Sequence, residues 1–199
     1  MVSLAYASGS DGFCPFARHL ALSASRVSRY NPPMTTSFRV GIGHDTHRLA
    51  ENRPLLLGGV RVAHARGLVG HSDADVVLHA LTDALLGAAG LGDIGDAYPD
   101  TDPAWKDADS SRFLRDALAR LNQDGWRVVN IDVIIFAQEP KLGPIKADIR
   151  NNLARLLGLD AACVNVKAKT GERVGAIGRA EAMSCQVVVL IEQATSPPR

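Results

Sequence analysis

Residues 38–47 read Phe-Arg-Val-Gly-Ile-Gly-His-Asp-Thr-His, and they carry the first clear structural pattern in the chain. The apolar residues at positions 38, 40 and 42 alternate with an arginine and two glycines. Alternation with a period of two is typical of a half-buried β-strand, in which successive side chains point to opposite faces. The stretch therefore predicts a first strand whose apolar side chains share one face.

The end of this predicted strand carries polar side chains that could bind a ligand. Asp45 and His47 lie two residues apart, so on a continued strand both project to the face opposite the apolar side chains. Gly41 and Gly43 precede them on that same face, where missing side chains would let a ligand or another segment approach closely. The pair predicts a site at which a carboxylate and an imidazole share one ion.

The pattern of helices and strands continues along the chain to residue 191. Gly58-Gly59 separates two short apolar runs and predicts a tight hairpin, because both glycines tolerate positive φ angles. Ser72, with Asp75 three residues on, predicts the capped start of an amphipathic helix. The further predictions are a helix around residues 113–121 that stops at Gly125, a strand at 128–137, a helix at 145–157, a strand at 164–168 and a strand at 183–191. Blocks of helices and strands in this order favour a two-layer α/β (α+β) fold, with a mixed sheet and helices packed on one face.

Composition excludes several classes of protein. The 199-residue chain has 22 Lys and Arg against 21 Asp and Glu, and its net charge of +1 is too small to attract a nucleic acid or an anionic membrane. Its three cysteines are far apart, which argues against a disulfide framework and indicates a reducing compartment. The longest apolar run, residues 187–191, is far too short to span a bilayer. We expect a cytoplasmic enzyme with a small-molecule substrate.

Residues 1–37 differ from the rest of the sequence. They are rich in Ser and Ala, carry three arginines and contain one acid, Asp11. One interpretation is a disordered tail or an over-extended sequence start, with Met34 as the true first residue. The other is a plastid or mitochondrial transit peptide, which in the plastid case would place the protein in the plastid stroma after removal of residues 1–33. We expect one domain over residues 38–193 and a short tail at 194–199.

The predicted helix after residue 72 adds a third candidate metal ligand. His79 has a carboxylate one helical turn away on each side, at Asp75 and Asp83, and either one could fix its tautomer. Together with Asp45 and His47 it gives three protein ligands, which leaves a tetrahedral ion one open position. The alternative is that His79 is a hydrogen-bonded core histidine.

Two further segments suggest phosphate binding. His71 and Ser72 lie at the predicted helix start, where free backbone N–H groups favour an anion, although Ser72 could serve only as a cap. Lys167, Lys169, Thr170 and Glu172 lie at the end of the strand at 164–168, with Arg179 after them, and they combine cations with a carboxylate able to hold Mg²⁺. The alternative for this second group is a solvated, charged loop.

Several long motifs occur in one order. They are GHDTH (43–47), GHSDAD (70–75), HALTDALLG (79–87), GDIG (92–95), YPDTDP (98–103), AQEPK (137–141), KAKTGE (167–172) and GR (178–179). In order and spacing they resemble the 2-C-methyl-D-erythritol 2,4-cyclodiphosphate synthase family over about residues 38 to 193. Two positions depart from that pattern, because the family often has threonine where Lys169 stands and an aromatic residue where Ala176 stands.

The resemblance implies a reaction and a set of ligands. The 2-phosphate of 4-diphosphocytidyl-2-C-methyl-D-erythritol 2-phosphate would attack the β-phosphorus, which releases CMP and closes a cyclic diphosphate. Asp45, His47 and His79 would bind Zn²⁺ or another divalent transition metal. Glu172 would bind Mg²⁺ or Mn²⁺. The family is also homotrimeric, with each active site between neighbouring subunits.

The resemblance also assigns roles at the substrate. His71 and Thr170 would stabilise the transition state. The residues implied to contact the substrate are Asp45, His47, His71, Ser72, Asp93, Ile94, Gly95, Tyr98, Pro99, Asp100, Thr101 and Asp102 on the zinc side, Ala137, Gln138, Glu139, Pro140, Lys141, Leu142 and Gly143 around the cytidine, and Lys169, Thr170, Gly171, Glu172 and Arg179. Two other functions would use some of the same residues: a zinc phosphohydrolase, and a non-catalytic metal-binding or isoprenoid-binding module.

Overall fold

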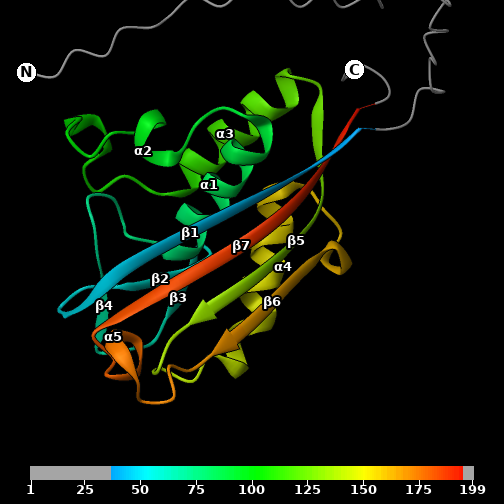
Figure 1. Cartoon of the computed structure of the whole chain (residues 1–199). Helices are drawn as coiled ribbons and strands as arrows, with labels where there is room; N and C mark the ends of the chain where they lie inside the picture. The colour runs from blue at the N-terminus through cyan, green and yellow to red at the C-terminus, as the bar shows by residue number, and fades with distance from the viewer. Residues whose placement is uncertain (1–36, 195–199) are drawn as a thin grey trace, which may run out of the picture. The chain divides into compact units, whose positions relative to one another are not determined.

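A five-stranded mixed sheet forms the framework of the protein in a computed structural model that describes residues 37–194 (Figure 1). Its strands are β1 (Phe38–Glu51), β4 (Arg66–Val69), β5 (Trp126–Phe136), β6 (Val164–Lys169) and β7 (Ala182–Gln193), in the spatial order β4-β1-β7-β5-β6. The pair β5–β6 is parallel and the other neighbours are antiparallel. The predicted mixed sheet is confirmed.

The helices cover one face of this sheet, as predicted (Figure 1). The longer ones are α1 (Val76–Ala89), α3 (Ser111–Gln123) and α4 (Lys146–Leu157). The short elements are α2 (Ile94–Ala97), α5 (Gly175–Gly178) and three 3₁₀ turns at Pro103–Trp105, Gly143–Ile145 and Ala161–Cys163. None of the helices within residues 37–194 combines the length and the apolar composition that crossing a bilayer requires. The predictions for residues 1–36 and 195–199 lie outside the described residues.

The predicted hairpin forms a separate two-stranded sheet. Strands β2 (Leu55–Leu57) and β3 (Val60–Val62) pair antiparallel around Gly58 and Gly59, whose φ angles are 62° and 74°. Only glycine adopts two successive positive φ angles at low cost, which is why the two-residue connection forms here.

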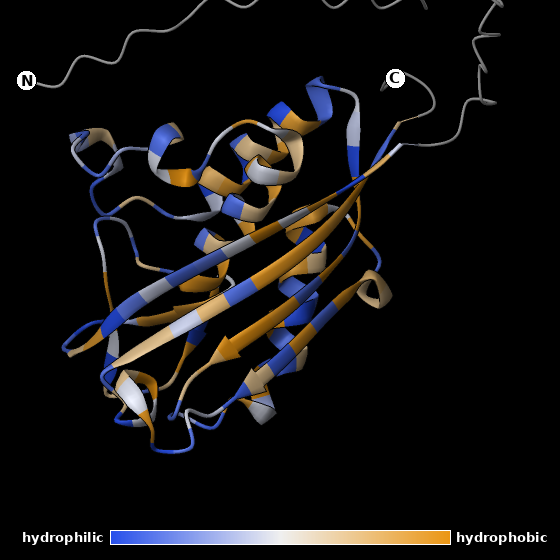
Figure 2. Ribbon diagram, viewed as in Figure 1, coloured by the Kyte–Doolittle hydropathy of each residue, from blue (hydrophilic) through white to orange (hydrophobic). Residues whose placement is uncertain are grey.

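The alternation along β1 is confirmed, but the glycine face is the buried one. Bands of opposite hydropathy follow each other along β1 in Figure 2. Phe38, Val40 and Ile42 are 55%, 66% and 60% exposed, and with Val188 of β7 they form the outer patch, an apolar surface on the helix-free face of the sheet. Gly41 and Gly43 are buried against α1. An alternating pattern shows that the two faces of a strand differ, but it does not show which face packs against the helices.

Helix α1 begins later than predicted. Its N-cap is Asp75, whose side chain accepts the backbone N–H groups of Val77 and Leu78, so Ser72 is not the cap. The same carboxylate accepts the N–H groups of Gly58 and Gly59 in the hairpin. Asp75 therefore fixes the first turn of α1 and docks the β2–β3 hairpin on it.

The short elements β4, α2 and α5 and the three 3₁₀ turns were not predicted. Strand β1 also runs beyond the predicted segment, through the Asp45–His47 pair to Glu51. Strand β4 pairs with that extension, with Arg48 opposite Val69 and Glu51 opposite Arg66. These segments are too short for a periodic pattern to mark them.

Candidate functional site

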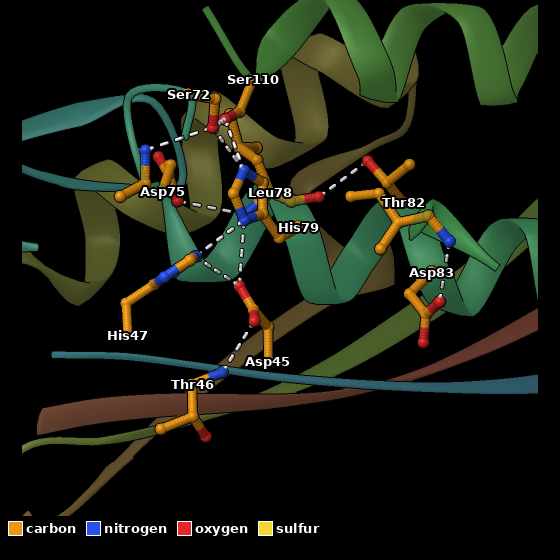
Figure 3. Close-up of polar contacts among 12 residues, drawn as sticks. Asp45, Thr46, His47, Ser72, Asp75, Leu78, His79, Thr82, Asp83 and Ser110 are labelled. Atoms are coloured by element: carbon orange, nitrogen blue, oxygen red, sulfur yellow. Dashed lines mark hydrogen bonds and ion pairs between the residues drawn. The ribbon is translucent and has the colours of Figure 1, made fainter. Parts of the chain in front are cut away.

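Two elements of the fold bring Asp45, His47 and His79 together. Asp45 and His47 project from one face of β1, and His79 comes from the first turns of α1, which packs on that face (Figure 3). The Asp45 carboxylate oxygen Oδ2 lies 2.9 Å from His47 Nε2 and 3.0 Å from His79 Nδ1, and the two ring nitrogens are 2.9 Å apart. The predicted grouping is confirmed.

The donor set fits a divalent metal ion. One oxygen and two imidazole nitrogens converge, with candidate ligand atoms all within 4.8 Å of one another. A carboxylate and two imidazoles on a common point are the ligand types that a divalent transition metal prefers. Burial alone would raise the pKa of the Asp45 carboxyl, but hydrogen bonds from His47 and His79 and their charges outweigh it and lower that pKa well below its ordinary value. Asp45 is therefore an anionic donor.

The partners of the second His79 nitrogen are not the predicted ones. His79 Nε2 lies 2.9 Å from Ser72 Oγ and 2.8 Å from Ser110 Oγ. Asp75 instead caps α1 and the hairpin. Asp83 accepts the Ile94 N–H at 3.2 Å and so anchors the start of α2, and burial raises the pKa of its carboxyl. The structure therefore assigns the second His79 contact to serine hydroxyls.

The metal-ligand group lies in a pocket of about 560 Å³. Its lining residues are Asp45, His47, Gly70, His71, Ser72, His79, Ile94, Gly95, Tyr98, Pro99, Asp100, Trp105 and Phe113. Most of the residues predicted on the zinc side are therefore gathered in one place. The predicted residues outside the lining are Asp93, which caps α2 by accepting the Asp96 N–H, Thr101, and Asp102, which caps the turn at Pro103.

Sequence reasoning predicted one residue of the aromatic wall of this pocket, Tyr98, and missed Trp105 and Phe113. Trp105 meets Tyr98 and Phe113 edge to face, with ring centroids 5.4 and 5.5 Å apart, and the Tyr98 and Phe113 rings are tilted by 30° at 4.7 Å. Phe113 belongs to the apolar stripe of α3 and was assigned only to the core. One side chain here serves both the core and the pocket.

His71 does not lie at a helix start, which corrects the prediction of an anion site there. Helix α1 begins five residues later, at Val76. The His71 ring nitrogen Nε2 instead donates to the carbonyl oxygen of Asp102 at 3.3 Å, so the ring bridges two loops at the rim of the pocket. His71 nevertheless lines the same pocket as the metal-ligand group, although no helix dipole acts there.

A second pocket, of about 200 Å³, lies where the parallel strands β5 and β6 end. It is lined by Ala137, Gln138, Pro140, Lys141, Leu142, Gly143, Lys146, Ala168, Lys169 and Thr170. The structure thus brings the segment 137–143, which was predicted to surround the cytidine, next to Lys169 and Thr170, which were also predicted to contact the substrate. Sequence reasoning missed Lys146 and Ala168. Glu139 is not in the lining and pairs with Arg66.

The remaining predicted residues make contacts of their own. Thr170 Oγ1 donates to Glu172 Oε1 at 2.6 Å. Arg179 forms a two-pronged ion pair with Glu181 at 2.8 and 2.9 Å, and Lys167 pairs with Asp132. Gly171 has the backbone of Gly178 directly against it, which holds this loop together. Neither pocket includes Gly171, Glu172 or Arg179, and no described residue lines both pockets.

Known proteins resemble this chain over nearly all of its described length. The family model described as the YgbB family matches residues 38–192. The 2-C-methyl-D-erythritol 2,4-cyclodiphosphate synthase of Bordetella petrii is 54% identical over 162 residues, which cover 81% of this chain and 100% of the relative. The synthase of that name from Chromobacterium violaceum is 56% identical over 157 residues, covering 79% of this chain and 99% of the relative.

Solved structures agree in fold. A 2C-methyl-D-erythritol-2,4-cyclodiphosphate synthase in its CDP-bound form matches with a TM-score of 0.72 and 40% identity, covering 77% of this chain and 99% of the other. The CDP complex of Plasmodium falciparum IspF matches with a TM-score of 0.70 and 32% identity, covering 80% and 98%. The family predicted from the motifs is confirmed, and the chain belongs to the YgbB family.

Proposed function

We propose that the chain is a 2-C-methyl-D-erythritol 2,4-cyclodiphosphate synthase, a metal-dependent phosphorus–oxygen lyase. It would convert 4-diphosphocytidyl-2-C-methyl-D-erythritol 2-phosphate to 2-C-methyl-D-erythritol 2,4-cyclodiphosphate and CMP. The observation that carries the proposal is the convergence of Asp45, His47 and His79 beside a pocket built from the family motifs. Relatives more than 50% identical over almost their full length bear that name.

The chemistry explains why no nucleophilic side chain is needed. The attacking group is the substrate's own 2-phosphate, which is already an anion, so the protein has to position the two phosphates and neutralise their charge. Burial raises the pKa of the Cys185 thiol well above its ordinary value, so this cysteine stays a neutral core side chain. The bond that forms joins a 2-phosphate oxygen to the β-phosphorus, and the bond that breaks frees CMP.

The proposed cofactors follow from the available ligands. Asp45, His47 and His79 would hold Zn²⁺ or another divalent transition metal, and Glu172 would hold Mg²⁺ or Mn²⁺. When bound, these ions supply positive charge at the diphosphate oxygens. His71, at the pocket rim, and Thr170, which donates to Glu172, would hold the phosphates in line.

The two pockets divide the substrate between them. Ser72, Ile94, Gly95 and the segment 98–102 would surround the methylerythritol phosphate, with Asp93 holding the first turn of α2 in place. Residues 137–143 would hold the cytidine, with Lys169 beside them. Gly171 and Arg179, which lie outside both pockets, would approach the phosphates. The CDP bound in two related structures supports a nucleotide as part of the ligand.

We also propose a homotrimer with each active site shared between neighbouring subunits. Two observations support it: the zinc side and the cytidine side line separate pockets of one chain, and the outer patch leaves Phe38, Val40, Ile42 and Val188 exposed. In a cyclic trimer every interface is head-to-tail, so one subunit can supply the zinc side and its neighbour the cytidine side.

Product mass tests the reaction. Incubation with the cytidine diphosphate substrate should yield CMP and a cyclic diphosphate, whereas a zinc phosphohydrolase would add water to its product and a binding module would show no turnover. Chelation should abolish the activity, and Zn²⁺ together with Mg²⁺ should restore it. Full activity in metal-stripped protein would contradict the proposal.

Subunit mixing tests the shared site. His79→Ala removes the zinc side and Lys141→Ala the cytidine side, so each parent trimer should be nearly inactive. After unfolding and refolding together, about three-quarters of the rings are mixed and each carries one intact site, which restores about a quarter of all sites. Refolding each parent alone is the control. Confirmed subunit exchange without recovered activity would place both sides of the site in one chain.

A further inference from the structure

Ser110 is a fully buried serine whose hydroxyl does not cap the helix that it begins. It stands at the N-cap position of α3, yet its side chain makes no cap hydrogen bond. The neighbouring Asp109 accepts the Ser111 N–H at 2.8 Å and so provides the cap. The Ser110 hydroxyl is thus available for other contacts. It turns toward His79 (Figure 3) and also contacts Asp73.

The direction of the Ser110 hydroxyl follows from its two partners. Asp73 Oδ1 accepts the Asp75 N–H at 3.2 Å and Asp73 Oδ2 accepts the Ser110 N–H at 3.1 Å. A carboxylate can only accept hydrogen bonds, so the Ser110 hydroxyl donates its single proton to Asp73 Oδ1. The lone pairs of Ser110 Oγ are left to face His79 Nε2 at 2.8 Å.

This arrangement fixes the proton on His79. Because Ser110 Oγ has no second proton to offer, the hydrogen bond requires a proton on His79 Nε2. A metal held by Nδ1, the atom that points at Asp45 and His47, would leave the neutral ring with its one proton on Nε2, where Ser110 Oγ accepts it. The resulting chain runs from the Asp73 carboxylate through the Ser110 hydroxyl to His79.

We infer that Asp73 and Ser110 are positioning residues that hold His79 in its Nε2–H tautomer and thereby set the affinity of the site for a divalent metal. Ser72 also contacts His79 Nε2, at 2.9 Å, but it lines the pocket and is already assigned to the substrate. Ser110 and Asp73 are absent from the pocket lining, so they act only through His79. The inference rests on the metal site of the proposed function, although it does not depend on which reaction occurs there.

Metal affinity measured without substrate tests the inference. Zn²⁺ is titrated against a chelator of known affinity in the full chain and in Ser110→Ala, which removes the acceptor of the Nε2 proton. Loss of such an outer hydrogen bond typically weakens metal binding about 10- to 100-fold, and we expect a loss in that range. Asp73→Asn should weaken binding in the same direction, because an amide no longer fixes the Ser110 proton. Ser110→Thr, which keeps the hydroxyl, should retain more affinity than Ser110→Ala.

The matched control is Ser111→Ala, which changes the adjacent buried serine and should leave the affinity unchanged. Proton NMR of the Zn²⁺-loaded proteins supplies a second measurement: the His79 Nε2 proton should exchange slowly with solvent in the unaltered chain and faster in Ser110→Ala. Folding of each variant is checked by thermal unfolding, and Asp73→Asn carries the test if Ser110→Ala does not fold.

Three outcomes would overturn the inference: equal Zn²⁺ affinity in the unaltered chain and Ser110→Ala, an equal loss in Ser111→Ala, or unchanged exchange of the His79 Nε2 proton in both Ser110→Ala and Asp73→Asn. Failure of the proposed function looks different. An unaltered chain that binds Zn²⁺ but forms no cyclic diphosphate contradicts the reaction alone, whereas an unaltered chain that binds no divalent metal contradicts both.

Discussion

Gly43 of β1 meets Ala80 of α1 backbone to backbone: a Cβ atom built on Gly43 would stand 2.0 Å from the Ala80 carbonyl oxygen. Gly41 has the same relation to Ala84, one turn further along the helix. This close approach allows His79 to reach the two ligands on the strand. The glycines therefore set the spacing of the metal site without contributing a ligand atom.

Gly43→Ala should destabilise the fold and weaken metal binding, because β1 and α1 must separate to admit the methyl group. Overpacking of this kind costs about 1–3 kcal/mol or more of unfolding free energy. Urea denaturation and Zn²⁺ titration measure the two effects. The matched control is Gly87→Ala in α1, whose new methyl group would meet only the Ile42 carbonyl at 4.0 Å and should stabilise the helix by up to about 1 kcal/mol. Normal metal affinity in a folded Gly43→Ala protein would contradict the argument.

His79→Ala should remove metal binding and activity while the protein still folds. The substitution deletes a metal ligand but leaves the apolar side chains of α1 in place, since Leu78, Leu81 and Leu85 are buried independently of it. Metal content, turnover and the thermal unfolding midpoint are the measurements. Collapse of the fold with the metal still bound would instead make His79 a core histidine.

Tyr98→Phe should make stability less sensitive to alkaline pH. Burial, and then the 2.6 Å hydrogen bond that the hydroxyl donates to Asp116, raise the pKa of Tyr98 well above its ordinary value of 10.0. Because the pKa of Tyr98 is higher in the folded state than in the unfolded chain, the contribution of its hydroxyl to stability is complete below about pH 10. That contribution is lost as the pH rises further, because the tyrosine of the unfolded chain then ionises. The difference in unfolding free energy between the two proteins, about 1 kcal/mol at neutral pH, should shrink above pH 10. A difference that stays constant to pH 11 would contradict this assignment.

Arg66→Met should weaken nucleotide binding from a position outside the second pocket. Arg66 donates to the Ala180 carbonyl at 2.8 Å and pairs with Glu139, so it ties β4 to the segment 137–143. Loss of both contacts should lower the affinity for CDP several-fold, as calorimetry can measure. Arg61→Met, on an exposed position of β3, is the control and should bind CDP normally.

The sequence predicted the metal ligands well because each follows from a local period. Asp45 and His47 lie two residues apart on a strand and therefore share a face, and the helical pattern after residue 72 placed His79 on a helix. Ser110 and Asp73 escaped prediction because they lie 37 residues apart and their contact depends on how α3 packs. The start of α1 was misplaced because Ser72 and Asp75 are both good capping residues, and only the docked hairpin shows which one is used.

Asp75 also couples unwinding of the first turn of α1 to release of the β2–β3 hairpin when the native state opens locally. One carboxylate receives N–H groups from Gly58 and Gly59 of the hairpin and from Val77 and Leu78 of α1. The first turn of the helix that carries His79 cannot unwind without releasing the hairpin, so the four amides should exchange with solvent deuterium as one cooperative unit. The glycine amides of a distant turn thus report on the integrity of the metal-binding helix.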